Sequence, residues 1–168
     1  MSFIQITNLT FSYPGSWDNI FENVSFSFDT AWRLGLIGRN GRGKTTLLRL
    51  LLGELEYSGR IESSAQFSYF PYRIPDKSLM TLDILSSLSP AEDWELIREL
   101  SSLDMDCEVL YRPFSTLSPG EQTKCLLAAL FLNPGHYLLI DEPTNHLDGR
   151  ARRTLAAYLQ RKKGFLLV

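Results

Sequence analysis

Hydrophobic and polar residues alternate early in the chain, which predicts β-strands. The alternation runs through "FIQITNLTFSY" (3–13) and "NVSFSFD" (23–29), with the turn-rich segment "YPGSWDN" (13–19) between them. Successive side chains of a strand point to opposite faces, so alternation is typical of half-buried strands. The short apolar run "RLGLIG" (33–38) then predicts a buried strand that ends in glycine.

A helical pattern follows the next glycines, at "TTLLRLLLG" (45–53), and Gly53 is expected to end that helix. A turn is expected around Gly59 and a strand in "FSYFPY" (67–72). The stretch 73–113 has the spacing of short helices. The region therefore reads as strand, glycine-rich loop and helix, followed by a strand and a helical part.

The clearest of these short helices is "SPAEDWELIREL" (89–100). We expect Ser89 as its N-cap, Pro90 at the first helical position and Glu92 completing a capping box. The remaining pattern predicts a helix in "TKCLLAALFL", an apolar core strand in "YLLID", a helix from Asp148 to Gly164 and the start of a strand in "FLLV".

Composition narrows the class of protein. The 168 residues, 44% hydrophobic and 21% charged, predict one globular domain. The net charge of -2 gives no general reason to expect nucleic-acid binding, and the two cysteines lack metal-ligand spacing, which favours a reducing compartment. We find no signal peptide and no apolar stretch near the roughly 20 residues that span a bilayer, so we expect no direct membrane insertion and a cytoplasmic protein.

The segment "GRNGRGKT", from Gly38 to Thr45, fits the phosphate-binding loop pattern G-x-x-x-x-G-K-[ST]. It lies where that chemistry requires it, after a strand and at the start of a helix. Glycines let backbone N–H groups turn toward an anion, and the helix N-terminus adds partial positive charge. Lys44 would reach the outer phosphates and the hydroxyl of Thr45 would ligate magnesium. The alternative is an ordinary glycine-rich turn with a surface lysine.

Two adjacent carboxylates, Asp141 and Glu142, end the apolar strand in "YLLIDE". Unpaired acids at the edge of a core are costly and require a reason. Beside a metal-nucleotide, Asp141 can hold magnesium and Glu142 can orient and polarise the attacking water. A solvated strand end is the alternative explanation.

The segment "LSPGEQ" (117–122) is consistent with a helix cap and with a phosphate site. Ser118 and Glu121 form a capping box like the one expected in "SPAE" (89–92), so capping alone explains them. The two segments differ at Gly120, which stands where the other has Ala91. Glycine costs about 1 kcal/mol relative to alanine in a helix, so it asks for another reason, such as close approach of an anion.

Together, "GRNGRGKTT", "LSPGEQ" and "YLLIDEPTNHLD" resemble the nucleotide-binding cassette of the ABC ATPase superfamily. "LSPGEQ" with "EPTNHLD" is most similar to the first cassette of ABC-F proteins, which carry two cassettes and act on ribosomes in translation or antibiotic resistance. The resemblance implies an α/β P-loop NTPase cassette with a mostly parallel core sheet, an N-terminal antiparallel β layer and a small helical subdomain at about 73–134. It further implies a single cassette domain over 1–168.

The resemblance also implies cofactors, partners and residue roles. ATP and Mg²⁺ would bind, a second cassette of the same full-length chain or of a homodimer would pair with this one, and ribosomal RNA would be a partner. Glu142 matches the catalytic glutamate. Nucleotide contacts match Tyr13, which would stack on adenine, and Gly38, Asn40, Gly41, Arg42, Gly43, Lys44, Thr45 and Thr46. Thr45 and Asp141 match the metal ligands, Ser118, Gly120, Glu121 and Gln122 match the signature facing an opposing nucleotide, and Asn145 and Asp148 match the cassette interface.

The chain departs from the family pattern at three places. Tyr72 stands where a glutamine ligand is usual, and Arg42 replaces a small residue. The family's switch histidine follows the strand that begins at "FLLV", and neither His136 nor His146 matches it. We therefore expect a C-terminally truncated cassette with weak or no ATP hydrolysis of its own, as part of an ATPase.

Two other functions stay open on sequence grounds. One is the energy-coupling subunit of an ABC membrane transporter, and the other is a nucleotide-gated binding module that does not turn over. Basic residues near the C-terminal end fit either an RNA contact or a solvated helix: Arg150, Arg152, Arg153, Arg161, Lys162 and Lys163.

Overall fold

The computed structural model describes residues 3–168, which divide into two compact units. The first unit contains the chain up to Tyr69 together with Gly135–Asp141 and Lys163–Val168. The second contains Phe70–Pro134 and Glu142–Lys162. The predicted phosphate loop therefore belongs to the first unit, and the predicted signature belongs to the second.

An antiparallel sheet forms one layer of the first unit. Its strands are β1 (Phe3–Phe11), β2 (Phe21–Asp29) and β4 (Ser58–Ser63), in the order β2-β1-β4. In the register of the sheet, Ile6 lies opposite Phe26 on one side and Ile61 on the other. The two strands predicted from alternation, and the expected N-terminal antiparallel layer, are confirmed.

Strand β4 was missed, because Gly59 was expected in a turn and instead lies within the strand. Its φ of 102° is in the left-handed region, and a Cβ there would lie 2.4 Å from the carbonyl oxygen of Asn8 on β1. Glycine is therefore required by the close approach of a neighbouring strand where the β1–β4 register shifts. That requirement comes from a distant segment and leaves no local signal.

A second sheet carries the predicted phosphate-loop and acidic strands. It contains β3 (Arg33–Gly35), β5 (Gln66–Phe70), β6 (His136–Ile140) and β7 (Phe165–Leu167) in the order β3-β7-β6-β5. Strand β7 runs parallel to both β3 and β6, as expected for a mostly parallel core. Strand β6 is buried, whereas β3 lies at the sheet edge and is less buried than predicted.

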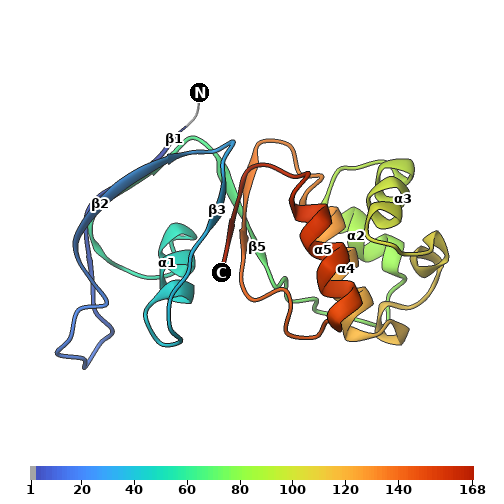
Figure 1. Cartoon of the computed structure of the whole chain (residues 1–168), viewed down its shortest axis with the longest axis horizontal. Helices are drawn as coiled ribbons and strands as arrows, with labels where there is room; N and C mark the ends of the chain where they lie inside the picture. The colour runs from blue at the N-terminus through green and yellow to red at the C-terminus, as the bar shows by residue number, and fades with distance from the viewer. Residues whose placement is uncertain (1–2) are drawn as a thin grey trace. The chain divides into compact units, whose positions relative to one another are not determined.

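Helix α1 (Lys44–Leu51) packs between the two sheets, as Figure 1 shows. Its leucines share one hydrophobic core with residues of both sheets: Ile4, Ile6, Leu9, Phe11 and Phe28 on the antiparallel side, and Tyr137, Leu139 and Leu166 on the other. The helix ends at the predicted place, where Gly53 has a φ of 73°. This packing fixes the start of α1, and with it the phosphate loop.

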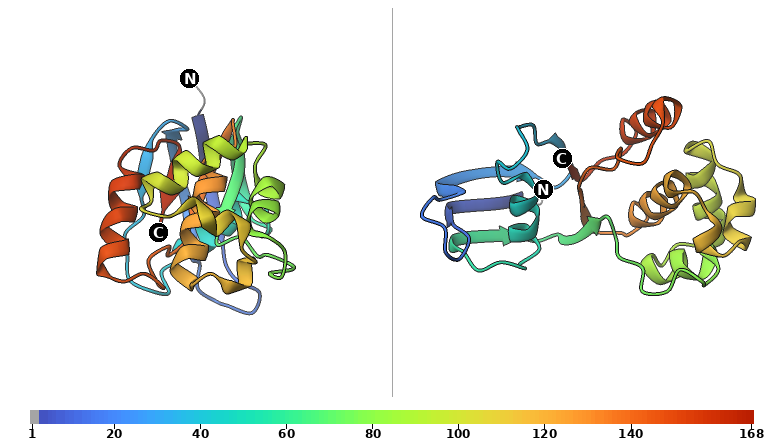
Figure 2. Two further views of the ribbon diagram at one scale, coloured as in Figure 1. Left: turned by 90° about the vertical axis from the view of Figure 1, so that its right-hand side faces the viewer. Right: turned by 90° about the horizontal axis from the view of Figure 1, so that it is seen from below.

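The second unit is helical (Figure 2). It contains α2 (Thr81–Leu88), α3 (Asp93–Ser102), α4 (Pro119–Leu130) and α5 (Gly149–Leu159), with short 3-10 turns η1 (Cys107–Tyr111) and η2 (Phe114–Thr116). Both α2 and α3 contact α4. The short helices predicted in 73–113 are confirmed, whereas α5 ends at Leu159, before the predicted Gly164. Within residues 3–168, no helix is long and apolar enough to span a bilayer.

The predicted start of α3 is wrong. The helix begins at Asp93, and Glu92 is its N-cap, in a capping box with Glu95. Ser89 instead ends α2, where its N–H donates to the carbonyl oxygen of Leu85. Two overlapping capping patterns compete in this segment, and the later one is used, because α2 already occupies Ser89.

The buried carboxylate of Glu99 in α3 binds one residue of the predicted basic cluster, Lys162. Glu99 is only 6% exposed, and its carboxylate accepts hydrogen bonds from the Tyr158 hydroxyl, at 2.6 Å, and from the Lys162 ammonium group. The ammonium group also lies over the rings of Phe131 and Tyr158. Lys162 is therefore part of the packing of the second unit and does not belong to a solvated helix face.

The two cysteines lie in contrasting surroundings, and both are free thiols. Cys125 is buried in α4, and this burial raises the pKa of its thiol to about 12. Cys107 is exposed at the start of η1.

Candidate functional site

The phosphate loop connects β3 to α1, and two of its glycines are required by backbone geometry. Gly41 and Gly43 have φ values of 77° and 85°. A Cβ on Gly43 would lie 2.4 Å from Cγ2 of Ile20, so glycine lets the loop pack against the start of β2. Gly43 is also the N-cap of α1 and provides no side-chain acceptor. The first N–H groups of the helix are therefore available to an anion.

Lys44 folds back over the loop that precedes it. Its Nζ donates to the carbonyl oxygens of Gly38, at 3.0 Å, and Arg39, at 3.3 Å, and lies 3.5 Å from Oδ1 of Asn40. The ammonium group is thus held above the loop's turned backbone by neutral acceptors, none of which neutralises its charge. A phosphate oxygen is a stronger acceptor for that charge.

Tyr13 and Thr46 contact each other directly. The Tyr13 hydroxyl lies 2.9 Å from Oγ1 of Thr46, and its ring meets Phe11 edge-on with centroids 5.0 Å apart. Thr46 is buried in the first turn of α1, whereas Thr45 beside it is exposed. The contact ties the segment after β1 to the phosphate-loop helix. Stacking of Tyr13 on adenine stays a prediction.

Asp141 follows β6 and has one carboxylate oxygen without a protein partner. Oδ2 accepts a hydrogen bond from the Tyr69 hydroxyl at 3.1 Å, while Oδ1 is buried with no partner in the described part of the chain. Burial and the neighbouring carboxylate raise the pKa of Tyr69 to about 12, so Tyr69 stays a neutral donor at pH 7. Tyr69 was not predicted as a site residue, and only its position on the strand beside β6 reveals it.

The chemistry around Asp141 fits a hard divalent cation. Residues 3–168 contain no group of three or more histidine, cysteine or acidic side chains suited to hold a metal by themselves. Magnesium commonly takes only one or two carboxylates and completes its shell with waters and substrate phosphates. An orphaned buried carboxylate oxygen is therefore the kind of ligand that fits such an ion.

Glu142 has an unusual backbone. Its φ of 46° is in the left-handed region, which non-glycine residues rarely adopt outside special sites. Its side chain is exposed, and its Oε2 accepts a hydrogen bond of 2.7 Å from Nδ2 of Asn145. The sequence motif predicted both residues but not their contact with each other.

The predicted signature begins α4 as a capping box. Ser118 Oγ accepts from the N–H of Glu121 at 3.3 Å, and the Glu121 carboxylate accepts from the N–H of Ser118 at 2.7 Å. This backbone hydrogen bond holds the pKa of Glu121 below its usual value. Pro119 occupies the first helical position. The capping interpretation of this segment is confirmed.

Packing explains why glycine stands at position 120. The comparison of segments 89–92 and 118–121 did not supply this explanation. A Cβ there would lie 3.2 Å from Cδ2 of Leu147 and 3.4 Å from the carbonyl oxygen of His146. Because Ala91 is not part of a capping box, its comparison with Gly120 is invalid. Close approach of the 146–147 loop accounts for the glycine without an anion, and an anion role stays a prediction.

Gln122 uses its side chain within the second unit. Nε2 donates to the carbonyl oxygens of Phe114, at 3.2 Å, and Leu117, at 3.0 Å, while Oε1 accepts from Nζ of Lys77 at 3.3 Å. These contacts hold η2 and the segment before α4. The described contacts of Gln122 therefore stabilise the segment that leads into the predicted signature.

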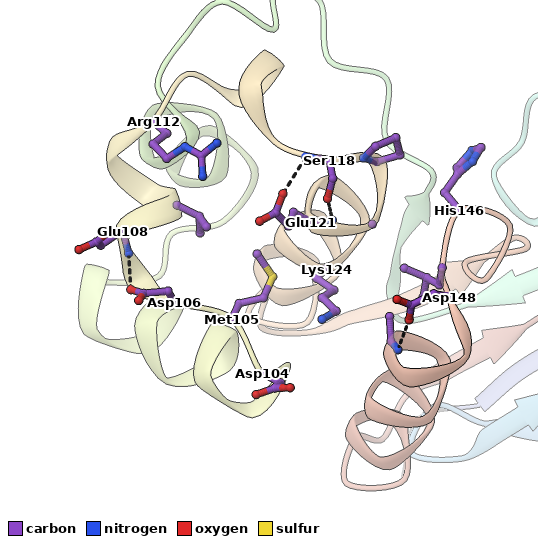
Figure 3. A pocket seen from close by; sticks show the side chains of 15 residues that line it. Asp104, Met105, Asp106, Glu108, Arg112, Ser118, Glu121, Lys124, His146 and Asp148 are labelled. Atoms are coloured by element: carbon purple, nitrogen blue, oxygen red, sulfur yellow. Dashed lines mark hydrogen bonds between the residues drawn. The ribbon is translucent and has the colours of Figure 1, made fainter.

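A cavity of about 580 Å³ opens beside the start of α4 (Figure 3). Asp148 lines it and caps α5, its Oδ1 accepting from the N–H of Ala151 at 2.7 Å. The cavity brings three predicted signature residues together with the predicted interface residue Asp148. The lining residues that matter here are Ser118, Gly120, Glu121, Lys124, His146 and Asp148.

Half of the predicted basic cluster is used inside the second unit. The Arg150 guanidinium pairs with Asp104 at 2.7 Å, and Nε of Arg152 donates to the carbonyl oxygen of Leu147 at 3.0 Å. With Lys162 bound to Glu99, three of the six residues have structural roles. The remaining three residues, Arg153, Arg161 and Lys163, are exposed and stay open to an RNA contact.

Replacing Ser118 by alanine should lower the free energy of unfolding by about 1 kcal/mol, since the N-cap acceptor of α4 is lost. Denaturant unfolding followed by circular dichroism measures the change. Ser86→Ala is the matched control, because Ser86 is exposed within α2 and does not cap a helix. An equal loss in both variants would contradict the assigned caps.

Comparisons with known proteins agree with the geometry. The sequence profile of the family described as "ABC transporter" matches residues 21–145. The chain is 33% identical over 152 residues to ABC transporter F family member 3 of Arabidopsis thaliana, covering 86% of this chain and 21% of that protein. It is 29% identical to ATP-binding cassette sub-family F member 3 of Homo sapiens, covering 89% of this chain and 22% of that protein. The chain thus spans about a fifth of the length of these relatives.

Solved structures show the same fold. A protein from Pyrococcus furiosus, described as an ABC transporter ATP-binding protein, superposes with a TM-score of 0.82 at 20% identity, covering 99% of this chain and 91% of that one. A cobalt transport ATP-binding protein gives a TM-score of 0.73 at 25% identity, covering 98% and 69%. The expected α/β cassette fold is confirmed.

Proposed function

The chain belongs to the ABC transporter family, with ABC-F proteins among its relatives, and from this premise we propose that it binds Mg-ATP as one cassette of a paired ATPase acting on the ribosome. That the chain is an ATP-binding cassette follows from its family. ATP hydrolysis, pairing with a second cassette and action on the ribosome are the further proposals. Each rests on particular residues or on the resemblance to ABC-F sequences.

The phosphate loop is the observation that carries the proposal. Two left-handed glycines turn the backbone, α1 starts with uncapped N–H groups, and the Lys44 ammonium group lies over the loop. Such an arrangement favours a polyphosphate anion over a neutral ligand. Asn40 and Arg42 add a polar and a cationic side chain to the same loop. Tyr13 would contact the adenine ring of the nucleotide.

Asp141 and Thr45 would hold magnesium beside the phosphates. Asp141 supports this role through its unpartnered buried Oδ1, and Thr45 through its exposed hydroxyl at the helix start. Bound magnesium would neutralise negative charge on the phosphate oxygens. The Tyr69 hydroxyl keeps the Asp141 carboxylate in place through Oδ2.

Glu142 is the proposed general base. Its carboxylate would take a proton from a water molecule whose oxygen bonds to the γ-phosphorus, while the bond from that phosphorus to the bridging oxygen breaks and ADP leaves. The exposed carboxylate and the left-handed backbone at Glu142 support this role, because unusual backbone geometry is typical of functional sites.

Ser118, Gly120 and Asp148 would face a second cassette. They line one open cavity in the second unit, beside the N-terminus of α4, where an incoming phosphate would meet partial positive charge. Glu121 and Gln122 would support this face through the capping box and the contacts behind it. The partner would be a second cassette of the same polypeptide or of a second chain.

The ribosome is proposed as the target because "LSPGEQ" and "EPTNHLD" resemble ABC-F sequences. Co-sedimentation of the ATP-bound protein with ribosomes tests it, and binding to a membrane permease in place of ribosomes would favour the energy-coupling subunit of a transporter. The similarity to solved structures of transport proteins shows the fold alone. It does not favour a role as the energy-coupling subunit of a transporter.

Replacing Asp141 by asparagine should remove the effect of magnesium on ATP affinity, because the neutral amide is a poorer ligand for a hard cation. Calorimetric titration with ATP, with and without Mg²⁺, measures the effect. We expect magnesium to tighten binding by about tenfold in the unmodified protein and by less than about twofold in the variant. An unchanged magnesium effect would contradict this role of Asp141, and no ATP binding by the unmodified protein would contradict the proposed function.

A further inference from the structure

We propose that Asn145 is a positioning residue that fixes the carboxylate of Glu142 through a side-chain hydrogen bond. This inference rests on the proposed role of Glu142 as the general base. The sequence motif placed Asn145 at the cassette interface, whereas its amide contacts a residue of its own loop. Nδ2 of Asn145 donates to Oε2 of Glu142 at 2.7 Å.

The backbone around Glu142 supports a local clamp. The main-chain N–H of Asn145 points to the carbonyl oxygen of Glu142 at 3.4 Å, so Asn145 reaches both the backbone and the side chain of the same residue. Pro143 between them is buried and limits the backbone. A residue in the left-handed region keeps that conformation only where its neighbours determine it, and these contacts supply such neighbours.

The two carboxylate oxygens of Glu142 have different surroundings, and this difference suits a general base. Oε2 is held by the amide of Asn145, and Oε1 has no hydrogen-bond donor among the described contacts. Because Glu142 is exposed and has three rotatable side-chain bonds, an unheld carboxylate would sample many rotamers. A fixed Oε2 restricts where Oε1 can lie, which raises the fraction of molecules ready to accept a proton from water.

Asparagine suits this position for a specific reason. Its amide is uncharged and supplies a donor, so it holds the carboxylate without replacing its charge. An aspartate at the same position has nearly the same shape but no donor, and it would bring two negative charges together. Asn145→Asp therefore removes the proposed interaction with the least change of volume.

The test measures steady-state ATP hydrolysis with both cassettes present, because little hydrolysis is expected of this cassette alone. It compares the unmodified protein with its Asn145→Ala, Asn145→Asp and Thr144→Ala variants. We expect kcat to fall about tenfold in Asn145→Ala and at least as much in Asn145→Asp, while KM and ATP affinity change by less than about twofold. Thr144→Ala is the matched control, since Thr144 is exposed in the same loop and the described hydrogen bonds to the Glu142 carboxylate come from Asn145. Equal kcat values in the unmodified protein and both Asn145 variants would overturn the proposal.

A double-mutant cycle separates positioning from a purely structural or interface role. If Asn145 acts through Glu142, Asn145→Ala should not slow the residual single-turnover hydrolysis of Glu142→Gln any further. ATP-dependent association of cassettes in that background should also be unchanged. A further loss of either quantity would instead assign Asn145 to the fold or to the interface and would overturn the inference.

Failure of the inference is distinguishable from failure of the proposed function. If Glu142→Gln hydrolyses ATP as fast as the unmodified protein, the assignment of the base is wrong and the inference falls with it. If Glu142→Gln is inactive while both Asn145 variants keep their kcat, the base stands and the inference alone is wrong. Melting temperatures of all variants confirm that the compared proteins are folded.

Discussion

Replacing Lys44 by alanine is expected to weaken ATP binding by at least about a hundredfold, which corresponds to about 2.7 kcal/mol. The ammonium group lies over the phosphate loop and touches only neutral oxygens, those of Gly38, Arg39 and Asn40. A triphosphate would replace these weak acceptors with charged ones, so the lysine gains more from the ligand than it loses from the loop. Calorimetric titration with ATP measures the effect.

The matched control for this change is Lys163→Ala. Lys163 belongs to the same unit, is exposed and carries the same charge, so its loss alters the net charge equally. Its effect on ATP affinity should stay below about twofold, because exposed charges far from a ligand are screened by salt. Equal losses in the two variants would show that general electrostatics, and not the loop, sets the affinity.

Replacing Glu142 by glutamine is expected to slow ATP hydrolysis, measured with both cassettes present, by at least about a hundredfold, because the amide cannot accept the proton from water. ATP affinity should change by less than about twofold, since the substitution keeps the shape of the side chain and its acceptor oxygen. The protein should therefore accumulate in an ATP-bound state. Phosphate release and retention of labelled ATP measure the two effects.

Glu22→Gln provides the comparison for this second prediction. Glu22 is exposed on β2 and has no place in the proposed chemistry, so hydrolysis should be unchanged. Normal hydrolysis by Glu142→Gln would sink the assignment of the base while leaving the assignment of the phosphate loop intact. Loss of ATP binding in Glu142→Gln would instead show that this carboxylate has a structural role.

The parts of the fold that depend on short-range chemistry were predictable from the sequence. The alternating strands β1 and β2, the apolar strand β6 and the end of α1 at Gly53 all appear where the pattern indicated. The capping box of α4 was also predictable, since Ser118 and Glu121 satisfy each other's backbone groups within one turn. In each case the determinant and its effect lie within a few residues.

Features that depend on distant segments were not predictable. Gly59 was expected in a turn, because nothing in its neighbourhood reveals the carbonyl of Asn8 on the adjacent strand. For Gly120 the sequence suggested close approach of an anion as one reason, and it did not reveal that Leu147 and His146 also approach this residue. Gly120 did indicate that some group comes close, but its sequence neighbours could not identify Leu147 and His146, whereas the residues around Gly59 indicated only a turn.

The sequence predicted the residues of the candidate site more completely than the contacts between those residues. The motifs named Asp141, Glu142 and Asn145, but they gave no indication that Tyr69 holds Asp141 or that Asn145 holds Glu142. Tyr69 comes from a different strand and has no motif of its own. The orientation of a catalytic carboxylate is set by such neighbours, which a linear pattern does not record.

The contrast between the two thiols gives the native chain a chemical handle. Alkylating reagents react with thiolates, and the raised pKa and burial of Cys125 suppress that form, so an iodoacetamide or maleimide dye would attach at Cys107. Cys107 lies between Asp106 and Glu108, both of which line the cavity beside α4. A fluorophore at this single position would report the arrival of a partner at the cavity without any engineered cysteine.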